Sequence, residues 1–485
     1  MGCRLRLLLA IALTTALPLA AGCSRAGGAP ERASLEAQPQ ENQLGVEATL
    51  YESERLDAVP LDDLGRLDRL RQQGRFEEFI DQALNVAAEQ PDRAILHTLR
   101  CEALLASGRN DAAESAAHRA AQLACDAEDT PLATAALKLW ATARFRQGKS
   151  LDDPQVARWL ATLPAEDEAV QMLLFWQQAI GSPTTFRIDD GAGGSYDVPL
   201  ADSVAGSLPF ELNAIQARAN GVAQPLVFID TGAAHTLITV EAADRAGVER
   251  GTSTTRLVGF AGLVAQPAVL ETLELGNLVL HDVPVLVGDS PPLTAQGGQM
   301  SLGTELMHHV RFHIDYPGRR VTVEPAGWRD FRRGSTPFWK IPLWTFSQVC
   351  LARGQTGDGA MARVLVDTGD RAGTFVSYRW GRRHLPPLRA ATSPVVFRFQ
   401  KRNLALEELD LGTQTLFAWR VEDTIPNELD RLNLVDILVG HDLLWPYRLT
   451  IDLPGRVLEL HSGTSPRDPA ARAPHDNGEN DGNQP

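Results

Sequence analysis

The middle of the chain alternates apolar and polar residues in the manner of β-strands. Residues 210–215 alternate, and the Asn-Gly pair at 220–221 favours a two-residue hairpin turn. The next apolar run ends in the sequence Asp-Thr-Gly-Ala, which begins at Asp230. Residues 240–247 have a helical pattern that stops at a glycine. The pattern therefore predicts mainly β structure, with a carboxylate directly after one strand.

The same pattern occurs a second time in the later part of the chain. An apolar run leads into Asp-Thr-Gly at Asp367, as the earlier run does at Asp230, and we call the separation of these two aspartates along the sequence the repeat offset. Two later landmarks keep the repeat offset: an apolar-glycine pair at 302–303 and 439–440, and an Asp-x-Pro-Gly-Arg sequence at 315–319 and 452–456. Three landmarks in one register predict a duplicated β domain.

The duplication brings two aspartates into a shared chemical setting. Each follows a buried-type strand and lies on a turn whose glycine permits a close backbone approach. If the two units pack about a pseudo-two-fold axis, the carboxylates meet and share a proton, because two adjacent carboxylates do not both ionise cheaply. One is then a general base for water, and the other protonates a substrate carbonyl oxygen.

These residues resemble the aspartic peptidases. The short repeat is closest to the retropepsin-like type, whereas two lobes in one chain resemble the pepsin-like arrangement, and the resemblance covers about residues 205–462. It implies Asp230 and Asp367 as the catalytic dyad, with threonines hydrogen-bonded across the lobe interface and no cofactor or metal. The residues that support the dyad in the family correspond here to Thr231, Gly232, Thr368 and Gly369.

A glycine-punctuated hairpin over residues 257–264 corresponds to the substrate-binding flap of the family. The flap residues that the resemblance implies are Gly259, Phe260, Ala261 and Gly262. Small, mobile residues suit a segment that closes over a substrate, although a plain structural hairpin is the alternative. The second repeat has a charged segment without glycine at 395–402. One mobile flap and one stiff counterpart are therefore expected.

Asp370 departs from the family pattern, which has Ala, Ser or Thr after the second Asp-Thr-Gly. The turn that contains it is also one residue longer than the first. An inward carboxylate would raise the pKa values of the dyad. We expect Asp370 to point outward, near Arg371, because a buried charge there has no evident partner.

Residues 56–182 have a different, helical character. A Gly-Arg turn occurs at Gly74 and again at Gly108, and a looser echo follows at Gly148. The spacing of the first two turns resembles the period of tetratricopeptide helix pairs. Such helices either only pack on the β unit or form a groove that binds a protein partner. The Gly- and Asp-rich residues 183–204 are expected to be a linker between separable domains.

The N-terminus has the pattern of a secretory signal. Basic residues precede an apolar stretch in residues 1–22 that is too short to span a membrane, and small residues stand just before Cys23. This resembles the lipobox of bacterial lipoproteins, so Cys23 is the expected lipidation site, the alternative being that it is incidental. Residues 23–55 then form a flexible tether and residues 463–485 a disordered tail.

Composition excludes several other functions. The chain of 485 residues is long enough for two or three domains, and its net charge of −15 argues against nucleic-acid binding. No phosphate loop or serine nucleophile motif occurs, and the spacing of His308, His309 and His313 matches no zinc site. Three cysteines are expected to be small buried residues without disulfides: Cys101, Cys125 and Cys350.

The sequence therefore predicts a tetratricopeptide-like α-helical domain followed by an all-β bilobal aspartic-protease unit made of two retropepsin-like repeats. The lobes span residues 205–328 and 336–462. The expected protein is a monomeric aspartic endopeptidase, anchored by lipid and facing the periplasm, with the outer membrane favoured. The alternatives are a peptide-binding pseudo-protease and a scaffolding lipoprotein whose helices bind a partner.

Overall fold

A computed structural model describes most of the chain between residues 62 and 462. The described residues are 62–180, 182–189, 194–201, 213–256, 263–290, 293–294, 297–326, 339–346, 349–357, 359–370, 374–384, 396–406, 409–420, 435–444 and 447–462. Cys23, the tether, the expected flap at Gly259–Gly262 and the C-terminal tail lie outside them. No helix in the described part is long and apolar enough to cross a membrane.

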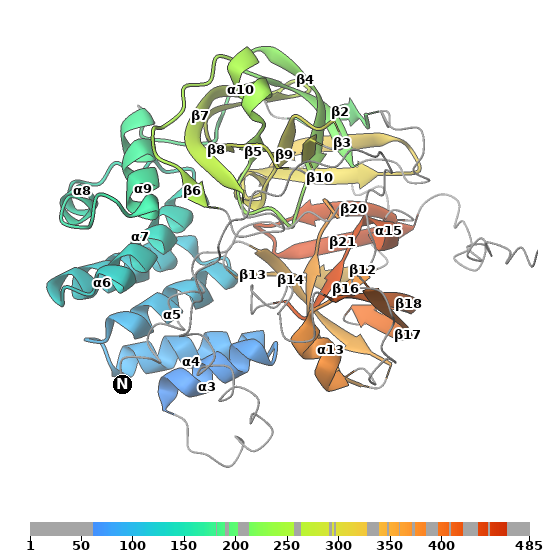
Figure 1. The fold of residues 1–485 in the computed structure, drawn as a ribbon, viewed down its shortest axis with the longest axis horizontal. Coiled ribbons are helices and arrows are strands. Elements are labelled where there is room, and N and C mark those ends of the chain that lie inside the picture. Colours follow the sequence, from blue (N-terminus) through green and yellow to red (C-terminus); the bar gives the residue numbers. More distant parts are fainter. Residues whose placement is uncertain are drawn as a thin grey trace, which may run out of the picture.

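The first described region is an array of helices in which neighbours from α3 to α7 pack in order, and α9 packs on both α7 and α8 (Figure 1). The helices are α3 (Asp63–Gln72), α4 (Phe76–Glu89), α5 (Ala94–Ala106), α6 (Asn110–Asp126), α7 (Thr130–Phe145), α8 (Pro154–Leu160) and α9 (Glu168–Ala179). Gly74, Gly108 and Gly148 follow helix ends with φ values of +68°, +73° and +68°, a left-handed conformation that glycine adopts without strain. The expected Gly-Arg turns therefore separate helices.

The first β unit is a closed ring of six strands. Its strands are β3 (Ala214–Ala219), β4 (Val222–Ile229), β5 (Leu237–Ile238), β7 (Val264–Leu275), β8 (Leu278–Val287) and β9 (Met300–Leu302). Their order is β8-β5-β9-β4-β3-β7, and β7 pairs with β8 to close the ring. The short helix α10 (Val240–Arg245) begins where the sequence predicts it, and β6 (Thr255–Arg256) adds to β7.

The second β unit has the same pairings. Its strands are β14 (Val349–Thr356), β15 (Met361–Val366), β16 (Thr374–Val376), β17 (Val396–Leu406), β18 (Leu409–Arg420) and β19 (Ile437–Val439). They close in the order β14-β15-β19-β16-β18-β17. The parallel pair β15 and β19 corresponds to the parallel pair β4 and β9. The strand β13 (Trp344–Phe346) adds to β14, and α13 (Tyr378–His384) follows β16.

A third sheet joins the two units (Figure 1). It has the order β12 (Trp339–Pro342), β21 (Val457–Ser462), β20 (Tyr447–Asp452), β10 (Val310–Asp315), β11 (Arg320–Pro325) and β2 (Tyr196–Pro199). The antiparallel pair β10 and β20 connects the halves, with Phe312 opposite Ile451 and Ile314 opposite Leu449. Because these four side chains are buried, the sheet fixes one half against the other.

The segment that the sequence predicts to be a linker contains two short paired strands among its described residues. Within it, β2 pairs with β11, and β1 (Arg187–Ile188) pairs with β8. The segment before β1 is also tied to the helical region, since Ser150 N donates to Pro183 O at 3.0 Å and Thr185 N to Gly148 O at 2.9 Å. Short strands form here because the outer edges of β8 and β11 offer unpaired backbone groups.

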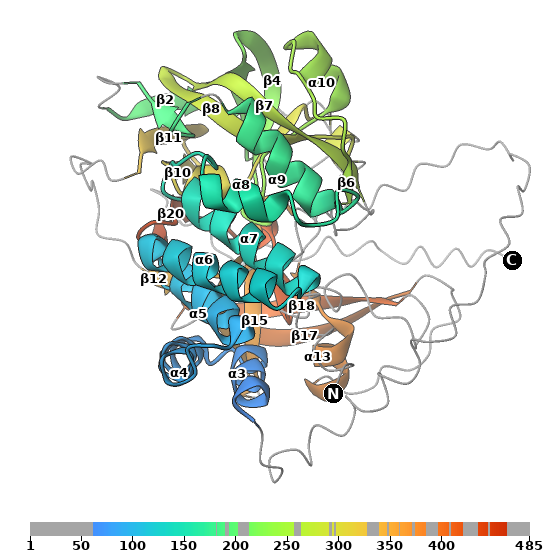
Figure 2. The same ribbon diagram turned by 90° about the vertical axis from the view of Figure 1, so that its left-hand side faces the viewer.

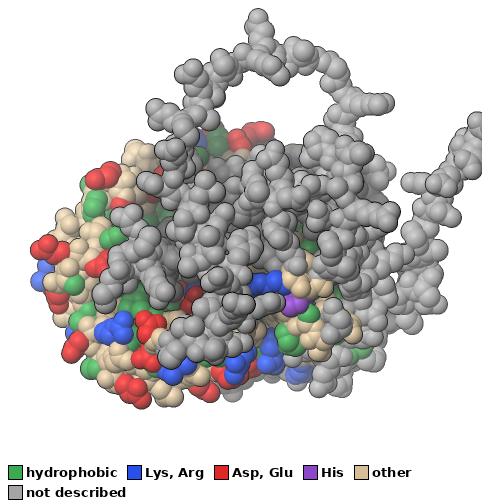
Figure 3. Space-filling view, turned by 60° about the horizontal axis from the view of Figure 1, so that its bottom comes forward, with side chains coloured by type: hydrophobic (Ala, Val, Ile, Leu, Met, Phe, Trp, Pro, Cys, Tyr) green, Lys and Arg blue, Asp and Glu red, His purple; other side chains and the backbone are tan. Residues whose placement is uncertain are grey.

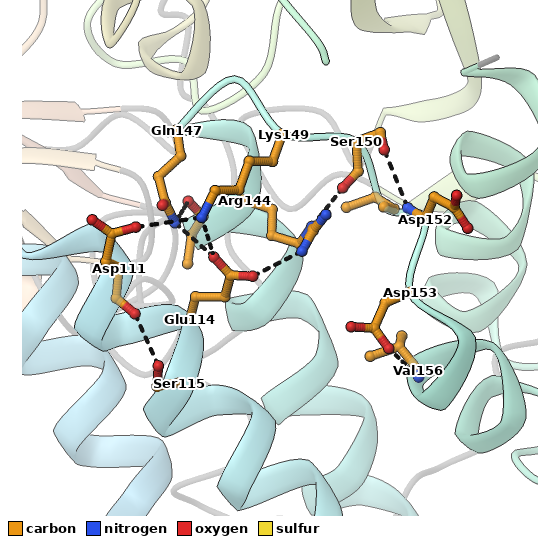
Figure 4. Close-up of polar contacts among 12 residues, drawn as sticks. Asp111, Glu114, Ser115, Arg144, Gln147, Lys149, Ser150, Asp152, Asp153 and Val156 are labelled. Carbon is orange, nitrogen blue, oxygen red and sulfur yellow. Dashed lines mark hydrogen bonds and ion pairs between the residues drawn. The ribbon is translucent and has the colours of Figure 1, made fainter. Parts of the chain in front are cut away.

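A polar cluster holds the end of α7 on α6 (Figure 4). Glu114 accepts hydrogen bonds from Arg144 at 2.8 Å, Lys149 at 2.9 Å and Gln147 at 3.0 Å. Lys149 also pairs with Asp111 at 3.3 Å. Because three donors converge on one carboxylate, the turn between α7 and α8 is held in one place.

The helical region packs against both β units (Figures 1 and 2). At one end, the Phe76 ring lies 5.1 Å from Trp344 and 4.9 Å from Phe346. At the other end, the Trp176 indole donates to the Ala268 carbonyl at 3.1 Å. The contacts between helices and strands are buried and largely aromatic, so the helices pack closely on the β units.

Surface charge is mixed on the face shown in Figure 3, where acidic and basic side chains of the described residues lie interspersed. One exposed ion pair joins the helical region to the second β unit, with Arg353 3.3 Å from Glu77. Exposed pairs of this kind contribute little to stability. The interface therefore depends on its buried aromatic contacts.

We expect Phe76→Ala to destabilise both regions together. Removing a buried phenylalanine costs about 3 kcal/mol, and Phe76 packs on β13 as well as on its own helices. Urea unfolding followed by tryptophan fluorescence and by far-UV circular dichroism should give one transition, with a lower midpoint in the variant. Asp81→Ala, an exposed change in the same helix, is the control. Two separate transitions, with the β units unaffected by Phe76→Ala, would contradict this.

Candidate active site

Each aspartate of the expected dyad lies just beyond a strand at the centre of its ring. Asp230 follows β4, and its N–H donates to Leu302 O on β9 at 3.1 Å; Asp367 follows β15, and its N–H donates to Val439 O on β19 at 2.9 Å. The apolar-glycine landmarks at 302–303 and 439–440 therefore hold the two aspartates. Since the parallel pairs are buried on all sides, the position of each carboxylate is set by the core of its ring.

The two threonines interlock across the boundary between the rings. Thr231 N donates to Thr368 Oγ1 at 3.1 Å, and Thr368 N donates to Thr231 Oγ1 at 3.0 Å. Each hydroxyl in turn donates to a strand carbonyl of the other ring: Thr231 to Val366 O at 2.6 Å and Thr368 to Ile229 O at 2.8 Å. Every hydroxyl is thus both donor and acceptor in a buried site, which holds the two turns together.

The glycines allow the carboxylates to approach. A Cβ at Gly232 would lie 2.5 Å from Cγ of Asp367, and a Cβ at Gly369 would lie 2.5 Å from Cγ of Asp230. Both distances are far below van der Waals contact. Each glycine therefore makes room for the carboxylate of the opposite ring, and any larger residue would push the dyad apart.

The two carboxyl groups are buried and lie close together. Asp230 is 6% exposed and Asp367 is 0% exposed, and each lies against the glycine of the opposite turn. Asp230 Oδ1 accepts from the N–H groups of Gly232 and Ala233 at 2.9 and 3.1 Å. Asp367 Oδ1 accepts in the same way from Gly369 and Asp370 at 2.9 and 3.1 Å. Two carboxyl groups this close and this buried favour one shared proton over two adjacent negative charges.

Burial raises the pKa of both aspartates. For Asp230, burial outweighs the hydrogen bonds from Ser301 and the backbone, which favour its charged form. For Asp367, burial acts together with the negative charges of Asp230 and Asp370, and its pKa lies well above the ordinary value. Ionising one carboxyl therefore makes the second harder to ionise, so the pair holds one shared proton over a wide pH range.

Asp370 does not point outward, and that expectation is wrong. Its side chain is 0% exposed, its N–H donates to Asp367 Oδ1, and its carbonyl accepts from His441 N at 2.7 Å. Ala233 has the same two backbone contacts in the first ring, with Asp230 and with Thr304. These bonds fix residue 370 in the turn, and the extra residue of this turn comes after it.

Sequence reasoning missed two residues that contact the site. Ser301 Oγ donates to Asp230 Oδ2 at 3.0 Å, and the Asn213 side chain donates to the carbonyls of Ile229 and Thr368. Each is a buried polar residue, whereas the residues that correspond to them in the second repeat are Leu438 and Cys350. Comparing the repeats position by position would have found both.

The other titratable residues have structural contacts. His313 lies between Thr450 Oγ1 and Glu324 Oε1 at 2.8 and 2.9 Å, and His309 stacks on Phe186. Within the described ranges, no cluster of three or more His, Cys, Asp or Glu side chains is arranged to hold a metal ion. The three cysteines are free: Cys101 and Cys350 are buried, and Cys125, against expectation, is only partly buried.

One comparison with known proteins covers the first ring. The model of the "Aspartyl protease" family matches residues 215–306. Among solved structures, the chain is similar to the crystal structure of aspartic proteinase from Irpex lacteus, with 11% sequence identity and a TM-score of 0.37, over 56% of this chain and 99% of that chain. No curated protein matches the chain. The chain therefore consists of a helical region and a β-rich region that contains an aspartic-peptidase-like domain.

Proposed function

We propose that the protein is an aspartic endopeptidase that hydrolyses peptide bonds with a water activated between Asp230 and Asp367. The observation that carries this proposal is the buried pair of carboxyl groups that face each other across the two glycine turns. Such a pair holds one proton and one negative charge, which supply the acid and the base that amide hydrolysis needs. The family match to residues 215–306 supports the first half of the site.

In the proposed reaction the dyad donates a proton twice, first to the carbonyl oxygen and then to the leaving amine. The charged carboxylate takes a proton from water as the water oxygen bonds to the peptide carbon, and the protonated carboxyl gives its proton to the carbonyl oxygen. The tetrahedral diol then collapses: the C–N bond breaks, the amine takes the proton that came from water, and one hydroxyl returns its proton to the dyad. The dyad ends in its starting state, and one water is consumed.

We infer that the two rings are repeats of one unit and that each supplies one aspartate. The equal pairings of the strands and the constant repeat offset support this. The lobe boundaries at 205–328 and 336–462 are part of the same proposal. The helices resemble tetratricopeptide pairs in period, and their buried contacts with β7 and β13 favour a packing role over a partner-binding groove.

The proposed location is the periplasmic side of a bacterial outer membrane, with lipid on Cys23. Support comes from the sequence of residues 1–55 alone. Two or more acyl chains give stable anchoring. Mass spectrometry of the mature N-terminal peptide tests this: an unmodified Cys23 in a wholly soluble protein would contradict it.

The second candidate is a pseudo-protease that binds peptides without cleaving them. The buried carboxylate of Asp370 beside Asp367 favours it, because a third acid disfavours ionisation of the dyad. A partner-binding scaffold has no comparable observation behind it.

We expect the purified mature chain to cleave members of a peptide library between pH 3 and 8. Asp230→Asn and Asp367→Asn should each lower kcat/KM at least about 100-fold, because each removes an acid or a base. Asp244→Asn, an exposed carboxylate in the first ring, is the control. Peptide binding by a wild type that cleaves nothing at any pH would instead establish the pseudo-protease.

Asp370→Asn should narrow the pH range of activity from its alkaline side. The charge of Asp370 raises the pKa of Asp367, so its removal lets the shared proton leave at lower pH. We expect the alkaline limb of kcat/KM to move down by about one pH unit, and the acid limb to move much less. An unchanged alkaline limb would mean that Asp370 exerts no charge on the dyad.

A further inference from the structure

The surroundings of the dyad are less symmetric than the dyad itself. Ser301 on β9 lies opposite Phe228 in the parallel pair that ends at Asp230. Leu438 on β19 lies opposite Leu365 in the pair that ends at Asp367. The two positions are therefore equivalent by strand register as well as by the repeat offset, yet one carries a hydroxyl and the other does not.

The hydroxyl gives Asp230 a donor that Asp367 lacks. Both Oδ1 atoms accept two backbone N–H groups, but among the described residues only Asp230 has a further donor, Ser301, whose hydroxyl lies 3.0 Å from Oδ2. Asp367 Oδ2 is buried and has no donor among the described residues other than the shared proton of the dyad. A hydrogen bond to a charged carboxylate is stronger than one to a neutral carboxyl.

A second difference acts in the same direction. The second N–H donor to Oδ1 of Asp230 is Ala233, whereas the second donor to Oδ1 of Asp367 is Asp370. A carboxylate next to Asp367 disfavours a second negative charge there. The other titratable groups packed around these turns are His441, whose backbone donates to Asp370, and the pair of His235 and Glu305 at 2.8 Å.

We propose that Ser301 is a positioning residue that places the negative charge on Asp230 and leaves the proton on Asp367. If the proposed endopeptidase function holds, Asp230 is then the base that takes a proton from water, and Asp367 is the acid that protonates the substrate carbonyl. The peptide carbonyl oxygen binds on the side of Asp367, and the attacking water on the side of Asp230. The assignment of charge is a property of the protein and does not depend on catalysis.

The test is a titration of the mature chain labelled with carbon-13 at the aspartate carboxyl carbons, followed by NMR. The dyad resonances are assigned from Asp230→Asn and Asp367→Asn. In the wild type, the first ionisation of the pair should move the Asp230 resonance most. In Ser301→Ala, that ionisation should occur about one pH unit higher, since the charged form has lost a donor. Ser301→Thr, which keeps the hydroxyl, should restore it.

Ser290→Ala is the matched control, because Ser290 is as buried as Ser301, at 6% exposure, but lies outside the bonds of the dyad. Its titration should equal that of the wild type. The proposal is overturned if Asp367 ionises first in the wild type, a result that does not depend on the folding of Ser301→Ala. It is equally overturned if Ser301→Ala leaves the first ionisation in place.

Kinetics separate this proposal from the proposed function. In an active enzyme, Ser301→Ala should move the acid limb of kcat/KM up by the same amount, and lower kcat more than it changes KM. A wild type in which Asp230 ionises first but no peptide is cleaved would refute the function and uphold the role of Ser301.

Discussion

The reciprocal hydrogen bonds between Thr231 and Thr368 are the interaction on which the candidate site depends. They cross from one ring to the other, and each hydroxyl is fully used because it accepts from one N–H and donates to one carbonyl. Water does not reach these buried groups, so breaking one of the bonds would leave a donor and an acceptor unpaired. The two turns therefore stay together, and the carboxylates beyond them are forced into one buried space.

Other parts of the fold keep the rings in that relation. The antiparallel pair β10 and β20 joins them at the base, and the helices pack on both through Phe76 and Trp176. Because these contacts are buried and join all parts of the fold, the distance between the carboxyl groups is set by the whole body of the protein. This explains how two groups that repel when both are ionised are held side by side.

The sequence predicted best where a local rule applied. The Asn-Gly hairpin formed because Asn220 and Gly221 both take positive φ, at 46° and 72°. The sequence does not predict the strands β1 and β2. They have only two and four residues, respectively, which is too short for an alternating pattern to be recognised. The predicted outward orientation of Asp370 is wrong, because a backbone bond to Asp367 that the sequence does not reveal holds this residue in the turn. Ser301 was overlooked because one serine in a short apolar run signals nothing until its partner is known.

The most direct measurement of the central claim is neutron diffraction from crystals of the mature chain grown in deuterated buffer near neutral pH. The account predicts carboxyl oxygens of Asp230 and Asp367 within hydrogen-bonding distance, with a single deuteron between them that is bonded to Asp367. Two deuterons, no deuteron, or carboxyl groups more than about 6 Å apart, beyond direct charge coupling, would contradict it.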